Sequence, residues 1–146
     1  MKWLGVGVGV VALLLVAMPL VFLVNARVSN PRVERELVED PGGERARKVM
    51  LLTLPSGRTI PVNFLREDCR VYAGADGWWW KELREGSRDV TIFVQGETLE
   101  GRARAVLDAP AYEKDVFSRL RPKAIPGTGT LVEILLDPTD PGGPLR

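Results

Sequence analysis

The chain has 146 residues, and its 20 basic and 19 acidic side chains give a formal net charge of +1. This length suits one compact domain, and the near-neutral charge gives the protein no electrostatic reason to bind nucleic acid. Histidine is absent and Cys69 is the one cysteine. These counts exclude Ser-His-Asp and Cys-His nucleophilic sites, most zinc sites and an intrachain disulfide, so no metal site is predicted.

Residues 3–24 contain no charged side chain and are mostly Val, Leu, Gly, Ala, Met and Phe. As a helix, this run would be about 33 Å long at ~1.5 Å per residue, enough to cross a hydrocarbon layer of ~30 Å. We therefore predict a transmembrane helix within an anchor over residues 1–26, with the lipid bilayer as partner. The small-residue spacing of residues 24–26 leaves a cleaved secretory signal open as the alternative.

The basic residues around this run indicate its orientation. Only Lys2 precedes it, whereas Arg27, Arg32 and Arg35 follow it. Because an excess of basic residues marks the cytoplasmic side, the main domain is expected in the cytoplasm, on a single-pass protein of the cell membrane.

Three further regions follow the anchor. Residues 27–47 are predicted to form a juxtamembrane linker, because apolar residues are sparse and the Asp-Pro-Gly-Gly of residues 40–43 breaks any helix. A short amphipathic turn fits residues 33–38. Residues 48–137 are expected to form the folded domain, and the Pro- and Gly-rich residues 138–146 a disordered tail.

The folded domain has mainly the pattern of strands, separated by turn residues. Pro61 indicates an edge strand or a bulge. Residues 78–85 suit a short helix that ends at Gly86, and a second helix runs from Pro110, with Asp108 as its cap, to Pro122. Its apolar side is expected to carry Tyr112, Val116 and Leu120, which are spaced four residues apart. The fold class predicted is mainly β with short helices, a small antiparallel barrel of about six strands. The expected strands are residues 49–54, 59–65, 69–73, 90–94, 98–107 and 130–136.

Several side chains have an ordinary structural interpretation. Cys69 is expected to be a small buried hydrophobe, and Tyr72 and Tyr112 to be core residues with a solvated hydroxyl. Three consecutive tryptophans, residues 78–80, cannot all face one way on a short helix. Either one or two pack in the core and the third lies at the membrane interface, or they stack on a planar ligand.

Two stretches resemble a known family. The Gly-Trp-Trp-Trp-Lys-Glu-Leu-Arg of residues 77–84 precedes a hairpin that contains the Gly-Arg-Ala of residues 101–103, and residues 56–61 read Ser-Gly-Arg-Thr-Ile-Pro. In order and content, residues 48–136 resemble the deazaflavin-dependent nitroreductase group of the split-barrel flavin-binding superfamily, which is also called pyridoxamine phosphate oxidase-like. The resemblance implies a split β-barrel that holds a flat tricyclic cofactor, a deazaflavin coenzyme or FMN.

The resemblance also implies a cofactor site. Arg58 and Thr59, from the strand entry that ends in Pro61, would contact the phosphate. The loop that begins with Gly74 and Ala75 would line the ring through its backbone. Trp79, Trp80 and Lys81 would lie beside the cofactor. No catalytic residue is predicted, although Tyr72 and Ser87 are the nearest to proton-donor candidates.

Two hypotheses follow for the function. The first is a membrane-anchored oxidoreductase that transfers hydride to a lipophilic acceptor, a quinone or a nitro compound. The alternative is a non-catalytic, membrane-tethered scaffold or binding module that keeps the split barrel without the cofactor. The short turn of residues 54–57 favours this alternative, because it lacks the cations that the family carries there. Related barrels are often dimers, which leaves a homodimer open.

Overall fold

The computed structural model describes residues 30–125 and 127–138, so the predicted anchor and most of the predicted tail lie outside the described residues. Within the described ranges, no helix is both long enough and apolar enough to cross a membrane. The chain divides into two compact units, residues 1–35 and 36–146, of which the second contains the barrel.

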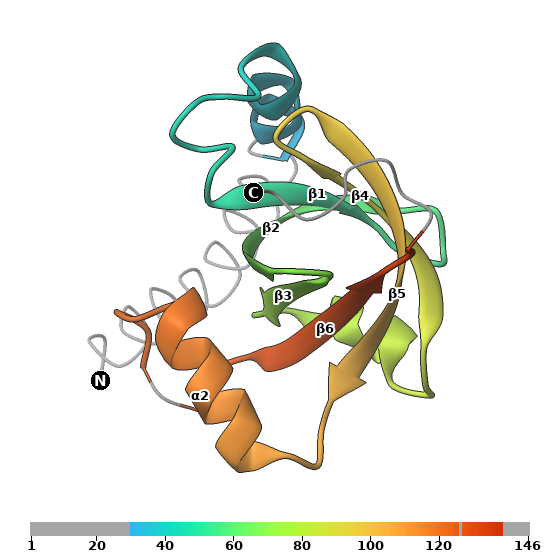
Figure 1. Cartoon of the computed structure of the whole chain (residues 1–146), viewed down its shortest axis with the longest axis vertical. Coiled ribbons are helices and arrows are strands. Elements are labelled where there is room, and N and C mark those ends of the chain that lie inside the picture. Colours follow the sequence, from blue (N-terminus) through green and yellow to red (C-terminus); the bar gives the residue numbers. More distant parts are fainter. Residues whose placement is uncertain (1–29, 126, 139–146) are drawn as a thin grey trace, which may run out of the picture. The chain divides into compact units, whose positions relative to one another are not determined.

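Six antiparallel strands close into a barrel in the order β1-β2-β3-β6-β5-β4 (Figure 1). The predicted mainly β fold with short helices is therefore confirmed. Closure leaves each strand with two neighbours, which removes the exposed sheet edges that favour aggregation. The strands are β1 (Val49–Thr53), β2 (Thr59–Glu67), β3 (Arg70–Ala75), β4 (Arg88–Val94), β5 (Glu97–Val106) and β6 (Thr130–Leu136).

The two seams that join the β1–β2 hairpin to the other strands are short. β1 pairs with β4 only over Leu51–Thr53, and β2 pairs with β3 only over Phe64–Glu67. By contrast, β4 pairs with β5 along the whole of Arg88–Val94. The barrel is thus a continuous β3-β6-β5-β4 sheet that is closed by a hairpin.

Pro61 lies opposite Leu51, in the part of β2 that pairs with β1 but not with β3, so the other side of the strand is a local edge there, as expected. Hydrogen bonds from Leu54 N to the Arg58 carbonyl (2.9 Å) and from Phe64 N to the Lys48 carbonyl (3.1 Å) set which pairs of the β1–β2 ladder are bonded. Pro61 falls between bonded pairs, where the backbone nitrogen points away from β1. Pairing with β3 starts only at Phe64, so the missing N–H costs no ladder hydrogen bond.

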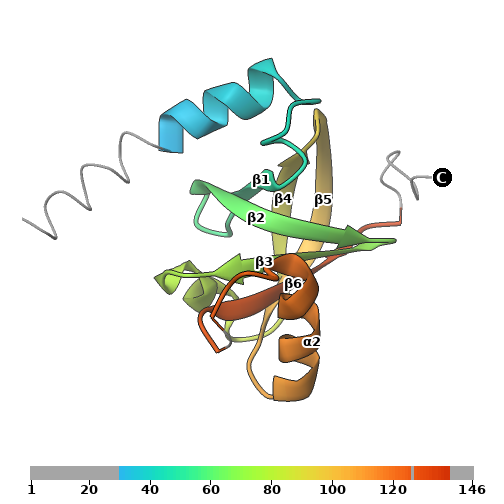
Figure 2. The ribbon, with the colours of Figure 1, turned by 90° about the vertical axis from the view of Figure 1, so that its left-hand side faces the viewer.

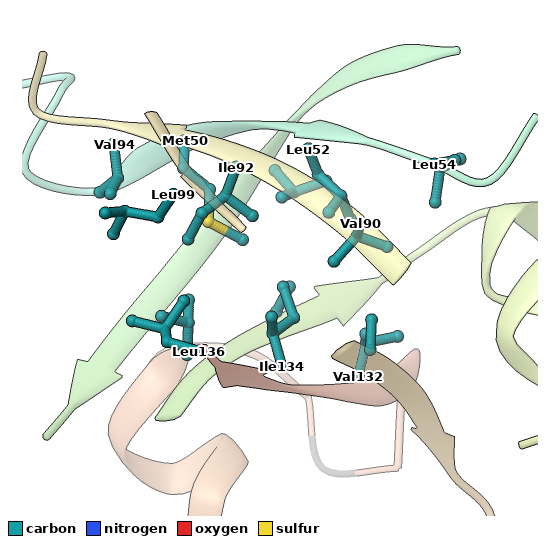
Figure 3. Close-up of a cluster of buried hydrophobic side chains, with 14 of the residues drawn as sticks. Met50, Leu52, Leu54, Val90, Ile92, Val94, Leu99, Val132, Ile134 and Leu136 are labelled. Carbon is teal, nitrogen blue, oxygen red and sulfur yellow. The ribbon is translucent and has the colours of Figure 1, made fainter. Parts of the chain in front are cut away.

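Alternate residues of the strands fill the barrel with aliphatic side chains (Figure 3). Met50 and Leu52 from β1, with Ile92 from the adjacent β4, face Ile134 from β6 across the core, and each of these four is at most 1% exposed. This alternation is the pattern of a strand with one buried face. Burial of these side chains supplies most of the driving force for folding.

The helix α2 (Pro110–Leu120) packs on the outside of the barrel, against β3 and β2 (Figure 2). Val116 is fully buried there with Tyr72 and Leu131. Tyr112 and Leu120 pack against the same cluster, which confirms the predicted apolar side of this helix.

Two expectations, the N-cap of the second helix and the burial of Cys69, are wrong. The helix α2 begins at Pro110, so Ala109 and not Asp108 is its N-cap. Alanine has no side-chain acceptor, and no side-chain hydrogen bond caps the helix. Cys69 is exposed, not buried. It belongs to the tight turn between β2 and β3, where Asp68 has a φ of 53°, so its side chain points away from the core.

The region predicted as a linker contains secondary structure of its own. Residues 30–39 are helical, and turns follow up to residue 48. Within the barrel-containing unit, Leu37 and Ala46 are buried, and Arg45 Nε lies 2.9 Å from Glu36 Oε1. Pro41 lies against the β4–β5 turn, since a Cβ on Gly96 would be 3.2 Å from its Cβ. Residues 36–48 are therefore a packed extension of the barrel.

Candidate functional site

All eight predicted site residues lie on elements at one end of the barrel. In this antiparallel order, β1, β3 and β5 end where β2, β4 and β6 begin. The short 3₁₀ helix η1 (Trp78–Leu83), yellow-green in Figure 1, follows β3 directly at that end. We call this end, made by residues 54–61, 74–83 and 129–130, the η1 end.

Leu83 fixes η1 to the barrel, because its side chain is fully buried in the barrel core. Trp79 and Trp80 are half-buried and pack against the same core. Trp78 is 76% exposed, and Lys81 Nζ lies 3.9 Å from the centroid of its ring. The structure thus places two indoles in the wall of the η1 end and the third, with its cation, in solvent. Stacking of Trp79 or Trp80 on a planar ligand stays a prediction.

Arg58 contacts η1 through a residue that the sequence analysis did not single out. Its Nη2 lies 3.4 Å from Glu82 Oε1, and the Ser56 amide donates a hydrogen bond of 3.2 Å to Glu82 Oε2. This carboxylate therefore ties the β1–β2 turn to η1. Nothing local in the sequence marks the pairing, because Arg58 and Glu82 are 24 residues apart.

Thr59 and Pro61 belong to the outer surface of the β1–β2 hairpin. The Thr59 hydroxyl lies 2.9 Å from the hydroxyl of Thr53, its cross-strand partner. Pro61 is half-buried beside Leu51. Thr59 follows Arg58 directly in the chain, at the start of β2.

Gly74 and Ala75 are covered by α2 and by the loop before β6. The Gly74 carbonyl accepts a 2.7 Å hydrogen bond from Arg121 Nη2, and Arg121 Nη1 pairs with Asp76. A Cβ on Gly74 would lie 2.8 Å from Arg121 Cζ and 2.9 Å from a ring carbon of Phe117. The absence of a Cβ at Gly74 therefore leaves room for the ends of the Arg121 and Phe117 side chains. Arg121 is a second residue that sequence reasoning missed.

Tyr72, one of the two proton-donor candidates, lies under α2 on the outer face of the barrel. Its hydroxyl accepts a hydrogen bond of 3.0 Å from Tyr112, and the two rings meet edge to face. Burial, followed by the hydrogen bond with Tyr72, raises the pKa of Tyr112 to about 12. Ser87, the other candidate, is exposed in the turn before β4.

A carboxylate and two arginines surround this tyrosine pair. Glu133 is 8% exposed on β6, and its two oxygens lie 2.9 Å from Arg104 Nη2 and 3.5 Å from Arg70 Nε. The buried charge is thus paired on both sides, as burial of a carboxylate requires. This arrangement fastens β3, β6 and β5 together.

The fold has counterparts among solved structures. A pyridoxamine 5′-phosphate oxidase-like protein from Listeria innocua superimposes with a TM-score of 0.50 at 15% sequence identity, over 62% of this chain and 84% of the other. The likeness shows the fold, a split β-barrel. This confirms the split-barrel part of the predicted resemblance.

Two further solved structures are similar to this chain. A pyridoxamine 5′-phosphate oxidase-like protein from Lactobacillus delbrueckii has a TM-score of 0.45 and 14% identity, over 64% of this chain and 88% of the other. General Stress Protein 26 from Bacillus anthracis has a TM-score of 0.44 and 19% identity, over 70% and 90%. No protein-family model and no curated protein matches the sequence.

Proposed function

We propose that this split barrel binds a flavin-type ring at the η1 end and acts as an oxidoreductase. The observation that carries the proposal is the placement of two half-buried indoles, Trp79 and Trp80, on the helix that the Arg58 turn contacts. Indoles offer flat apolar faces to an aromatic ring, and a guanidinium is suited to an anionic tail. The fold supports the proposal, because the similar structure from Listeria innocua is described as pyridoxamine 5′-phosphate oxidase-like.

The residues present suit such a group in distinct ways. Trp79 and Trp80 would pack against the ring, Lys81 would offer a cation at its rim, and Arg58 with Thr59 would hold the phosphate. A flavin or deazaflavin supplies hydride chemistry when it is bound. The protein would contribute binding and orientation, and the covering of the η1 end by Leu83 and the indoles would limit water.

A lipophilic acceptor, a quinone or a nitro compound, is the substrate class we propose. This part rests on the sequence, in which residues 3–24 predict a membrane anchor. An anchored enzyme meets an apolar acceptor at the raised local concentration of the bilayer. Placement of the domain on the cytoplasmic side follows from the basic residues after that run.

Titration of the full-length protein in detergent with FMN, a deazaflavin and riboflavin tests ring binding, read as quenching of cofactor fluorescence. Replacing Trp79 or Trp80 with leucine should weaken binding about tenfold, since an aromatic pair is worth roughly 0.5–1.5 kcal/mol beyond its buried area. Trp78→Leu is the matched control and should change affinity less than about threefold, because Trp78 is largely exposed. Quenching by none of the three compounds would refute ring binding.

The second candidate function is a scaffold module without a cofactor. It is favoured by the pairing of Arg58 with Glu82 and by the cover that Arg121 and Phe117 place over Gly74. A rate measurement separates the two functions. Oxidation of chemically reduced FMN by a soluble quinone or nitroaromatic should accelerate in the presence of the oxidoreductase, whereas a scaffold would leave the rate unchanged.

A further inference from the structure

The β1–β2 turn presents an amide and a guanidinium on a fixed backbone. Gly57 N donates to the Leu54 carbonyl (2.8 Å), and Leu54 N donates to the Arg58 carbonyl (2.9 Å). Gly57 has a φ of +83°, a conformation that suits glycine and closes the turn. These bonds leave the Ser56 amide directed out of the turn, on the side of η1.

The ligand of this amide in the structure is a side chain of the protein itself. Glu82 offers one carboxylate oxygen to Ser56 N at 3.2 Å and the other to Arg58 Nη2 at 3.4 Å. Both distances are at or beyond the long end of the range for N–H···O hydrogen bonds, which is 2.7–3.2 Å. The Glu82 side chain is 28% exposed and that of Arg58 57%, so water and ions reach the pair.

A backbone amide beside a guanidinium is a donor set for an oxyanion with several oxygens. A phosphate ester carries about −1.5 to −2 charge and three strong acceptor oxygens, against one charge and two oxygens for a carboxylate. It can engage an arginine through two parallel hydrogen bonds, whereas Glu82 reaches only one guanidinium nitrogen here. A phosphate can therefore form more and stronger hydrogen bonds with this turn than the Glu82 carboxylate does.

We propose that residues 56–58 form an anion cradle, that Glu82 fills it in the ligand-free protein, and that a phosphate monoester takes its place. Glu82 is then a specificity-determining residue, because its charge opposes any anion that does not displace it. This inference rests on the proposed function for the assignment of the phosphate to a flavin-type cofactor, since η1 carries both Glu82 and the two indoles. The cradle itself is defined by Ser56, Arg58 and Glu82 alone.

Inorganic phosphate is the probe that tests the cradle without any ring. The full-length protein in detergent is titrated while the backbone amide of Ser56 is followed by two-dimensional NMR. In Glu82→Gln, which keeps the shape and removes the charge, phosphate should bind about tenfold more tightly than in the wild type. Adding Arg58→Ala to that variant should abolish the saturable shift.

The matched control is Glu85→Gln, because Glu85 is exposed one turn further along the chain and its replacement changes the net charge equally. It should leave phosphate affinity at the wild-type value. Equal phosphate affinity in Glu82→Gln, Glu85→Gln and the wild type would overturn the cradle. A gain of equal size in both variants would overturn it as well, because a general charge effect would then explain the result.

A parallel titration with FMN and riboflavin, which lacks the phosphate, separates this inference from the proposed function. The cradle predicts that Glu82→Gln tightens FMN binding and leaves riboflavin binding unchanged. Ring binding of equal strength for FMN in all variants would overturn the cradle and keep the proposed function. A phosphate response at Ser56 without quenching of either ring compound would support the cradle and refute the proposed function.

Discussion

Replacing Leu83 by alanine should loosen η1 from the barrel. The Leu83 side chain is fully buried among the core residues. Truncation of a buried leucine removes its transfer free energy and leaves a cavity, a change that costs 2–5 kcal/mol in protein cores. Because η1 is short and lies at the end of the barrel, part of the cavity can collapse, and we expect a loss of about 3 kcal/mol. For a domain of this size, that corresponds to a fall in Tm of roughly 12–20 °C.

Thermal unfolding followed by far-UV circular dichroism measures this loss. Leu107→Ala is the matched control, because the same atoms are removed from a side chain that is 51% exposed. It should cost less than about 1 kcal/mol. A Leu83→Ala protein that melts within about 4 °C of the control would contradict the docking of η1 into the core, and with it the position of the indoles.

Three other measurements test the packing of the barrel and of α2. Gly101→Ala should cost about 1–3 kcal/mol, because the new Cβ would lie 2.7 Å from a backbone oxygen of β6, while Gly42→Ala, which meets nothing within 4 Å, serves as its control in the same melts. Arg121→Ala should cost about 2 kcal/mol of stability, because the charged hydrogen bonds to Gly74 and Asp76 are lost. Arg119→Ala, which removes an exposed ion pair, should cost less than about 1 kcal/mol. Equal losses in the two variants would contradict the role of Arg121 in holding α2 to β3. Tyr112 should titrate near pH 12 by ultraviolet absorbance, and since the unfolded chain releases this proton near pH 10, the free energy of unfolding should fall as the pH rises from about 10 to 12. A midpoint near 10 in the folded protein would show that the phenol is not held by burial and its neighbouring tyrosine.

Much of the fold could be predicted because its signals are local. Apolar runs such as residues 49–54 and 130–136, each bounded by turn residues, indicate strands without any knowledge of their neighbours in the fold. The apolar side of α2 was visible from spacing alone. Boundaries were harder, and Cys69 shows why. A shift of one residue between strand and turn exchanges a buried side chain for an exposed one.

The site could be predicted only as a set of elements that meet at one end. The family resemblance named Arg58, Gly74 and residues of η1 together, and the strand order of the structure places them at the same end of the barrel. What they touch there was not predictable, because Glu82 and Arg121 pair with residues far away in the sequence. Neither pairing has a periodicity or a turn signature. Contacts of this kind depend on how the barrel closes, which the pattern of one strand does not encode.

The short seams of the β1–β2 hairpin divide the molecule into two unequal mechanical parts. One is the β3-β6-β5-β4 sheet with η1 and α2, and the other is the hairpin that carries Arg58. Parts of a protein with few contacts to the rest open locally at a lower free energy than the core does. The Glu82 carboxylate bridges these two parts at the η1 end. The anionic group at that position therefore links the hairpin to the rest of the barrel, and replacing Glu82 there with another anion changes how readily the hairpin separates from the sheet.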